Sequence, residues 1–355
     1  MLKLVALGFG QRALPSALSL GRSAIQQPTL CVSRTAYQQT FTRGIRDASN
    51  RGSFTRRVVN VRQVEEVQQS LKRKIGPMEV GQLAVCGGAV LGLGSLCYYG
   101  LGLANEPGAI DRAAVWPQYV RHRIRDTYMY FGASVAVAAG SAMAVFRSPA
   151  GHKFFAFCQR RPILSTVGII AAMIGTGQAM MAVPYSPGLG TKQMLWLLNC
   201  GILGLVVAPV GALGGAIALR AAWYTAGIVG GLSTVAACAP SDQFLKWAGP
   251  LGIGLGGVLV ASIGSMFVPA TTTLGLSLYS ISLYGGLLLF SAFLLYDTQK
   301  IIRKAETHPV SHNPYSGWSV APFDPINASH HIVMDALNIF IRMAQILAMG
   351  GNRRK

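Results

Sequence analysis

Acidic residues are scarce in this chain, and one long stretch has no charged residue at all. Only 12 of the 355 residues are Asp or Glu, and charged residues make up 12% of the chain against 51% hydrophobic residues. Residues 247–296 contain no Asp, Glu, Lys or Arg. Because soluble domains carry about 25% charged residues, this deficit excludes an ordinary soluble fold and indicates a bilayer protein.

Motifs for metal binding and catalysis are also lacking. The six cysteines show no CxxC or other ligand spacing, so we interpret them as small packing residues. Neither a serine-protease motif nor a GxGD motif is present. We therefore expect no enzyme and no cofactor, with an intramembrane protease built on a pair of acids as a minor alternative.

Basic residues outnumber acids, but their distribution does not point to nucleic acid. The formal net charge is +19, and in residues 1–60 nine Lys or Arg stand against the single acid Asp47. An Arg-rich, acid-poor N-terminus that begins MLKLVALGFGQRALPSALSLGRSA is typical of a mitochondrial transit peptide. We predict such a leader over 1–60; a basic tail that stays on the protein is the alternative.

Eight apolar segments follow, each close to the roughly twenty residues that a helix needs to cross a bilayer. Because lipid cannot satisfy open backbone groups, these segments must be helices, and the sequence predicts an all-α polytopic membrane protein. The predicted spans are 80–104, 127–146, 163–183, 193–219, 223–240, 248–269, 274–297 and 332–349.

Glycine spacing, proline and loop charge add expectations about packing and orientation. Glycines four residues apart at 88/92, 211/215, 227/231 and 252/256 favour close helix contacts. Pro209 predicts a kink in the fourth span, which could line a transport path or simply be absorbed by packing.

Eight crossings place both termini in the matrix. The basic segments RKIGP, FRSPAGHKFFAFCQRRP and GGNRRK agree with that orientation, whereas VRHRIRD and QKIIRK do not.

The last span carries its polar residues on one helical stripe. His331, Asp335, Asn338, Arg342 and Gln345 follow steps of 4, 3, 4 and 3. A charged side chain at the bilayer centre costs about 2.5–3.5 kcal/mol, so such residues need water or a partner. Asp335 and Arg342 are roughly 10 Å apart along the axis, too far for an ordinary pair within one helix.

A second acid, Asp297, closes the predicted seventh span and should reach a depth similar to that of Asp335, because the two spans are antiparallel. Two carboxylates brought close cannot both ionise cheaply, so we expect the pair to hold a proton near neutral pH or to exchange it for a cation. The alternatives are an interfacial Asp297 that is solvated or locally paired with Lys300, and an Asp335 that makes a structural hydrogen bond between helices.

Three separated motifs resemble those of the transmembrane Bax inhibitor motif (Bax inhibitor-1-like) family. FLLYDTQKI is similar to that family's signature at the end of its sixth core helix, MDALNIFIRMAQIL to its last helix and AAWYTAGIVGGLSTVA to its central motif. The resemblance covers roughly residues 110–355. The leader, the extra span and the basic tail make the chain most similar to the mitochondrial member.

The resemblance implies a seven-helix core over 127–349, preceded by a juxtamembrane segment and an extra transmembrane helix over 61–126 and followed by a basic tail, 350–355. It implies calcium/proton exchange or a pH-gated calcium leak in the mitochondrial inner membrane, with Asp297 and Asp335 binding calcium and protons. Arg147 is the candidate for the family's arginine latch, although it ends the first core helix rather than the second. Asn338 and Arg342 are supporting polar residues.

The resemblance also implies restraint of apoptosis and cristae organisation, with inner-membrane proteins and cytochrome c as protein partners, although no motif encodes these roles. The lipid bilayer, calcium ions and protons are the other expected partners, and nucleic acid is not one. The alternative function is a structural protein that organises cristae or inner-membrane complexes without transporting ions.

Overall fold

The structure, a computed structural model, describes residues 76–104, 108–240, 242–269, 271–309 and 321–352. The predicted leader and the last three residues of the basic tail lie outside this set. Within it, eight helices are long and apolar enough to cross a membrane, and no strand occurs among the residues described. The prediction of an all-α polytopic membrane protein is confirmed.

The eight spans follow one another along the chain, some of them interrupted by short turns of another helix type. They are α4 (Pro77–Gly100), α6 (Gln118–Arg147), α8 (Pro162–Ala182), α9 (Thr191–Val207) with η2 (Ala208–Leu213), α10 (Gly215–Cys238), η3 (Leu245–Trp247) with α11 (Ala248–Phe267), α12 (Thr273–Ser280) with η4 (Ile281–Gly285) and α13 (Gly286–Thr307), and α14 (Pro325–Asn352). Two short helices, α5 (Ala109–Ala113) and α7 (Pro149–Arg160), lie between spans.

Several predicted boundaries are wrong, and the physical reasons can be identified. The fourth span ends at Leu213 instead of 219: Pro209 falls in the 3₁₀ turn η2, and Gly214, at a φ of 108°, redirects the chain into α10. Pro209 therefore ends the α-helical part instead of kinking its middle. The supposed basic loops also turn out helical, VRHRIRD in the first turns of α6 and most of FRSPAGHKFFAFCQRRP in α7.

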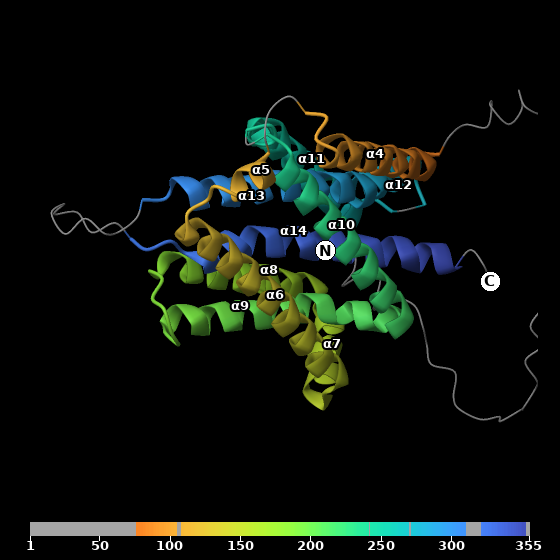
Figure 1. Cartoon of the computed structure of the whole chain (residues 1–355). Coiled ribbons are helices and arrows are strands. Elements are labelled where there is room, and N and C mark those ends of the chain that lie inside the picture. Colours follow the sequence, from red (N-terminus) through yellow and green to blue (C-terminus); the bar gives the residue numbers. More distant parts are fainter. Residues whose placement is uncertain (1–75, 105–107, 241, 270, 310–320, 353–355) are drawn as a thin grey trace, which may run out of the picture. The chain divides into compact units, whose positions relative to one another are not determined.

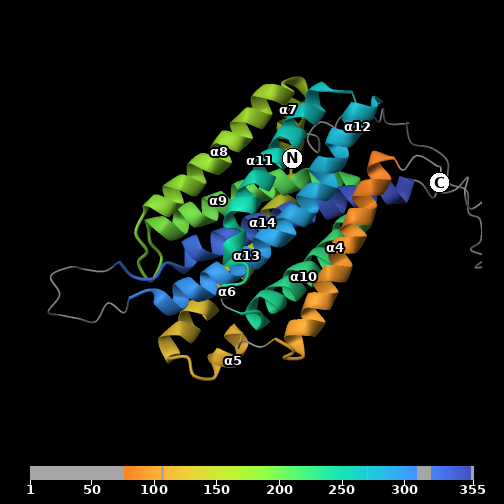
Figure 2. The same cartoon turned by 90° about the horizontal axis from the view of Figure 1, so that it is seen from above.

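Helix α14 is the centre of the bundle. It packs against α6, α9, α10 and α13, and 56% of its most apolar stretch is buried, more than in any other span and far above the 6% of α4. Figure 1 shows α13 beside α14, with α8 and α9 on one side of this pair and α4 and α11 on the other, and Figure 2 shows α4 and α8 at opposite sides of the pair. Buried side chains such as Ile332 and Ile339 fill these contacts. The polar stripe of α14 thus lies inside protein.

Glycine pairs contribute less to this packing than the sequence predicts. Gly88 of α4 does meet Leu288 of α13, but at the pairs 227/231 and 252/256 an added Cβ would touch nothing within 4 Å. A close approach between two spans is elsewhere, where an added Cβ on Gly204 of α9 would overlap the backbone of Ala138 in α6. Spacing alone does not tell which side of a helix faces a neighbour.

The eight crossings give the bundle two faces, which we name by what lies there. The tail face holds α7 and the end of α14, and the connection face holds α5 and the connections 183–190 and 239–247. At the connection face the buried amino group of Lys192 pairs with Asp324 and donates a 2.7 Å hydrogen bond to the carbonyl of Val183. Asp324 also accepts a 3.0 Å bond from the backbone N–H of Asn327. This ion pair holds the start of α14 against α9.

Replacing Asp324 by Asn tests the importance of that ion pair. The amide oxygen still accepts the bond from Asn327, but the charge of Lys192 is left buried and unpaired, a situation that costs about 3–5 kcal/mol. We expect a clear fall in the midpoint of thermal unfolding of the detergent-solubilised protein. The matched control is Asp242→Asn, which breaks an exposed ion pair with Arg303 and should cost about 1 kcal/mol or less. Equal shifts in both variants would contradict this account.

Candidate functional site

Asp297 and Asp335 occupy matched positions on neighbouring helices. Helix α13 continues ten residues beyond Asp297 to Thr307, and α14 begins ten residues before Asp335 at Pro325. Both acids therefore lie roughly 15 Å from the helix ends at the connection face. The prediction that Asp297 closes its span is wrong, because QKIIRKAET continues the helix with isoleucines turned inward and lysines outward.

The two side chains meet inside the bundle. Asp297 is 7% exposed and Asp335 is 5% exposed, and the two side chains are close enough to interact directly. Two carboxyl groups this close can hydrogen bond to each other only when one proton lies between them. Among the residues described, no donor reaches Oδ2 of Asp335. Since a buried carboxylate is stable only when paired or hydrogen-bonded, this site favours a shared proton or a bound cation.

Two basic side chains lie beside Asp297. Nζ of Lys300 is 4.0 Å from Oδ1 of Asp297, and the Lys300 side chain is 46% exposed, so this long ion pair contributes little to stability. His331, one turn before Asp335 on α14, interacts electrostatically with Asp297. Asp297 is thus buried as well as paired, unlike the solvated interfacial residue of the alternative reading.

A cavity of about 230 Å³ leads from the pair toward the connection face. Its volume is enough for several water molecules. Asp297 lines this cavity and Asp335 does not, so water reaches Asp297 first and Asp335 lies behind it. The other lining residues are Met181, Lys300, Ile301, Lys304, Asn327, Ala328 and His331.

Toward the tail face, the stripe on α14 continues to a buried arginine with its own partners. Arg342 Nη1 donates to Oδ1 of Asn338 (3.0 Å), and Nε donates to the carbonyl of Ser282 (3.2 Å) in the π-helical turn η4. The guanidinium also lies 4.7 Å from the ring centre of Phe290. These contacts supply Arg342 with neutral acceptors, and no ion pair within the described part of the chain joins it to an acid.

Arg147, the candidate latch, does not approach the acids. It is the exposed last residue of α6, at the tail face, whereas Asp297 and Asp335 lie toward the connection face. Arg160 and Arg161, at the end of α7, belong to the same face. None of these three arginines therefore lies at the acid pair.

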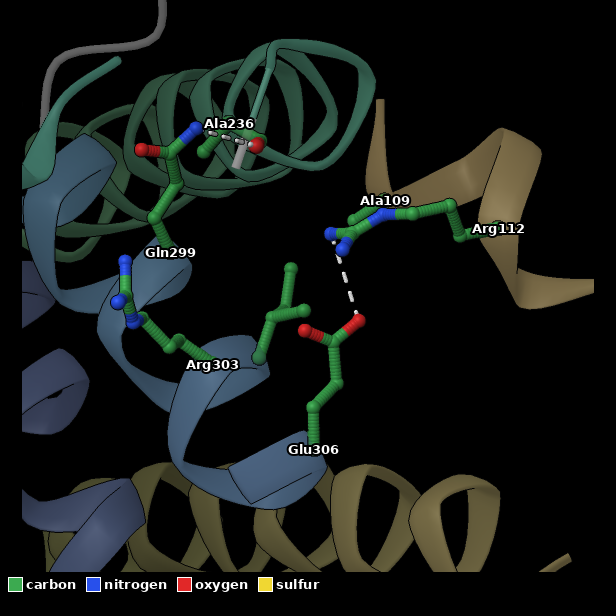
Figure 3. A pocket seen from close by; sticks show the side chains of 7 residues that line it. Ala109, Arg112, Ala236, Gln299, Arg303 and Glu306 are labelled. Atoms are coloured by element: carbon green, nitrogen blue, oxygen red, sulfur yellow. Dashed lines mark hydrogen bonds and ion pairs between the residues drawn. The ribbon is translucent and has the colours of Figure 1, made fainter. Parts of the chain in front are cut away.

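A second group of polar contacts, missed from the sequence, fixes the end of α13 (Figure 3). Nε2 of Gln299 donates to the carbonyls of Pro240 (2.7 Å) and Ala236 (3.3 Å) at the end of α10. Glu306 pairs with Arg112 of α5 at 3.3 Å. The space between these residues, about 10 Å³, is too small for a ligand. The group braces the segment that carries Asp297.

Comparison with known proteins now decides the family. Residues 120–352 match the family model Bax1-I, described as "Inhibitor of apoptosis-promoting Bax1". The chain belongs to this family. This Bax inhibitor-1-like region begins in the first turn of α6 and includes both acids of the pair, and the resemblance noted from the sequence motifs is confirmed.

Individual relatives agree with this assignment. The chain is 50% identical over 289 residues to the growth hormone-inducible transmembrane protein of Rattus norvegicus, covering 81% of each chain. It is 31% identical over 177 residues to Bax inhibitor 1 of Rattus norvegicus (48% of this chain, 71% of the relative). It is 25% identical over 242 residues to an uncharacterized protein of Helicobacter pylori strain J99 (65% and 88%). No solved structure matches it significantly.

Helix α4 lies before the Bax inhibitor-1-like region but docks onto it next to Arg342. Gln82 donates to the hydroxyl of Tyr284 in η4 (3.2 Å), and Ser280 donates to the carbonyl of Pro77 (2.7 Å). The extra span thus contacts the same π-helical turn whose Ser282 carbonyl holds the arginine.

Gly286 provides the space for Arg342, and adjacent glycines allow a matched test. A Cβ at Gly286 would overlap the guanidinium of Arg342, whereas a Cβ at Gly285 would make an ordinary 3.7 Å contact with Ile281. We expect Gly286→Ala to destabilise the protein by about 1–3 kcal/mol, as overpacking does. Gly285→Ala should leave the midpoint of thermal unfolding near that of the wild type. Similar midpoints for both variants would show that Arg342 is not fixed as described.

Proposed function

We propose that this protein exchanges calcium for protons, or passes a pH-gated calcium leak, across the mitochondrial inner membrane. The observation that carries the proposal is the buried, adjacent pair Asp297 and Asp335 at a cavity that opens toward one face. Carboxylate oxygens are the ligands that Ca²⁺ prefers. A proton occupies the same oxygens, so calcium and protons compete for one site.

Charges in the cavity oppose calcium in the conformation described. Lys300 and Lys304 line it together with Asp297, and like charges in a partly buried space repel a divalent cation. For calcium to reach Asp335, Lys300 has to swing toward water, which its half-exposed position allows. The arrangement supports slow, controlled movement of calcium rather than an open channel.

The first test is calcium flux in liposomes that contain the purified full chain, with pH set on both sides. We expect a flux that depends on the pH gradient and that falls to the level of empty liposomes in the double variant Asp297→Asn/Asp335→Asn. Asp242→Asn, an exposed acid at the connection face, should keep the wild-type flux. No flux at any gradient, or equal flux in the double variant, would end the transport proposal.

The variant Lys300→Met should raise the calcium flux, whereas the double Asp→Asn variant should lower it. Removing a positive charge 4.0 Å from Asp297 should raise the initial calcium flux by about two- to tenfold, since an ion pair of this kind is worth about 1 kcal/mol. Lys246→Met, a lysine near the connection face outside the cavity, is the control. A lower flux in Lys300→Met would show that the lysine assists the ion instead of opposing it.

The inner-membrane placement and the orientation rest on charge. The acid-poor basic leader is typical of mitochondrial import, and the basic N-terminal region, α7 and the tail GGNRRK would put the tail face in the matrix. An epitope tag after Lys355 should then survive protease treatment of mitoplasts and be digested once the inner membrane is dissolved. Digestion in intact mitoplasts would reverse the orientation.

The family description supports restraint of apoptosis as a further part of the proposal. Another part is cristae organisation, with inner-membrane proteins and cytochrome c as partners. The internally satisfied contacts of Arg342 favour a structural protein without transport as the second candidate. That candidate predicts unchanged mitochondrial calcium flux in the double variant Asp297→Asn/Asp335→Asn, together with disturbed cristae when the chain is lost.

A further inference from the structure

A separate cavity of about 560 Å³ lies between α6 and α10, with α14 as its floor. Its size is typical of ligand pockets, which measure about 300–1,000 Å³. Its walls are almost wholly apolar, and we call it the α6–α10 groove. The lining residues are Tyr128, Phe131, Gly132, Val135, Ala138 and Ala139 of α6; Val207 of α9; Ala218, Ala222, Thr225, Ala226, Val229, Gly230 and Ser233 of α10; and Val333, Ala336, Leu337 and Phe340 of α14.

The groove is long and narrow, and it runs along a membrane span. On α10 it extends from Ala218 to Ser233, fifteen residues or roughly 22 Å. A helix with its side chains is roughly 10–12 Å across and takes up roughly 2,000 Å³ over that length, more than this cavity holds. A whole partner helix therefore does not fit inside it, whereas a single hydrocarbon chain does.

The groove opens where lipid surrounds the protein. Val135 is 45% exposed, and Ala222 and Ala226 are exposed as well, at positions in the middle of their spans. An apolar hollow at this depth is not filled by water, which needs polar partners. The molecules available there are lipids, and their acyl chains have the required length and polarity.

The polar atoms of the groove lie mainly at one end. Tyr128 and Ser233 line the groove nearer the connection face, and no hydrogen-bond partner among the residues described reaches the buried hydroxyl of Ser233. Tyrosine is enriched at this level of a membrane because its ring is apolar and its hydroxyl is wet. The ester group of a lipid chain seated in the groove would meet these hydroxyls. Ala336, a lining residue on α14, directly follows Asp335, so the groove adjoins the acid pair.

We propose that the α6–α10 groove binds one acyl chain of a membrane phospholipid, with its ester end toward Tyr128 and Ser233. This inference does not rest on calcium transport. It requires only that the spans lie in a bilayer, as their length and composition indicate.

Photolabelling tests the proposal on the full chain in liposomes. The probe is a phosphatidylcholine with a diazirine halfway along one acyl chain, and the labelled peptides are identified by mass spectrometry. We expect labels on the groove residues of α6 and α10, above those on exposed apolar residues of α11 such as Ile253 and Leu259. Uniform labelling of all lipid-facing residues would overturn the proposal.

Adjacent positions on α10 supply a matched pair of variants. Ala226→Trp fills the groove and should lower its labelling about tenfold, the loss expected when roughly two methylene groups lose their place. Gly227→Trp points into open space and should leave labelling unchanged. If Ala226→Trp does not fold, Ala222→Phe is measured in its place with the same expectation. Unchanged labelling in the groove-filling variant would refute the proposal.

Thr225→Val tests the identity of the occupant. The hydroxyl of Thr225 is buried halfway along the groove, and no partner among the residues described reaches it. A plain hydrocarbon at this depth makes no hydrogen bond, so the isosteric variant should label within about twofold of the wild type. A tenfold loss would indicate an occupant with a polar group at its middle and would overturn the assignment to an acyl chain.

Discussion

The fold depends on one constraint: the polar side chains of α14 have to be satisfied without help from lipid. A helix that carries Asp335, Asn338 and Arg342 cannot face hydrocarbon without a large cost. The bundle solves this by making α14 its central helix and by giving each polar residue a specific neighbour. Helix α4, in which only 6% of the most apolar stretch is buried, stays at the periphery.

The stripe on α14 has two halves of opposite charge, and they are satisfied in different ways. Near the connection face, Asp335 lies against Asp297, and Oδ2 of Asp335 has no hydrogen-bond partner among the residues described. Nearer the tail face, Arg342 is held by neutral oxygens and an aromatic ring. The arginine therefore has its partners within the protein, whereas the acids leave an oxygen without one. This difference is why the proposed exchange is placed at the acids.

The sequence predicts the class of fold and the pair of acids well, because both follow from strong physical signals. A stretch of fifty residues without a charged side chain does not fit an ordinary soluble protein. Acids at matching positions in two neighbouring antiparallel spans are brought to similar depth by the topology. Boundaries are predicted poorly, since helices such as α6 and α13 continue beyond the hydrocarbon with amphipathic turns. Hydropathy marks where lipid ends, not where the helix ends.

Contacts that depend on which side of a helix faces a neighbour cannot be predicted from this sequence. Lys192 looks like an ordinary interfacial lysine in the sequence, yet it is fully buried against Asp324. Arg147 has the chemistry of a latch but stands at the wrong face, and the glycine pair 227/231 faces open space. In each example the sequence gives the type of residue but not its partner. The partner depends on how each helix is rotated in the bundle, and the periodicity of the sequence does not determine that rotation.

The two charged halves also bear on the transport proposed above. In that proposal, a cation at Asp335 would next meet Arg342, roughly 10 Å further along α14, and like charges repel strongly in a medium of low dielectric constant. Passage to the tail face would then require the guanidinium to leave the carbonyl of Ser282. That carbonyl belongs to η4, a π-helical turn of the kind often found at functional sites. Because α4 docks on η4 through Gln82, the span that precedes the family region contacts the turn that holds Arg342.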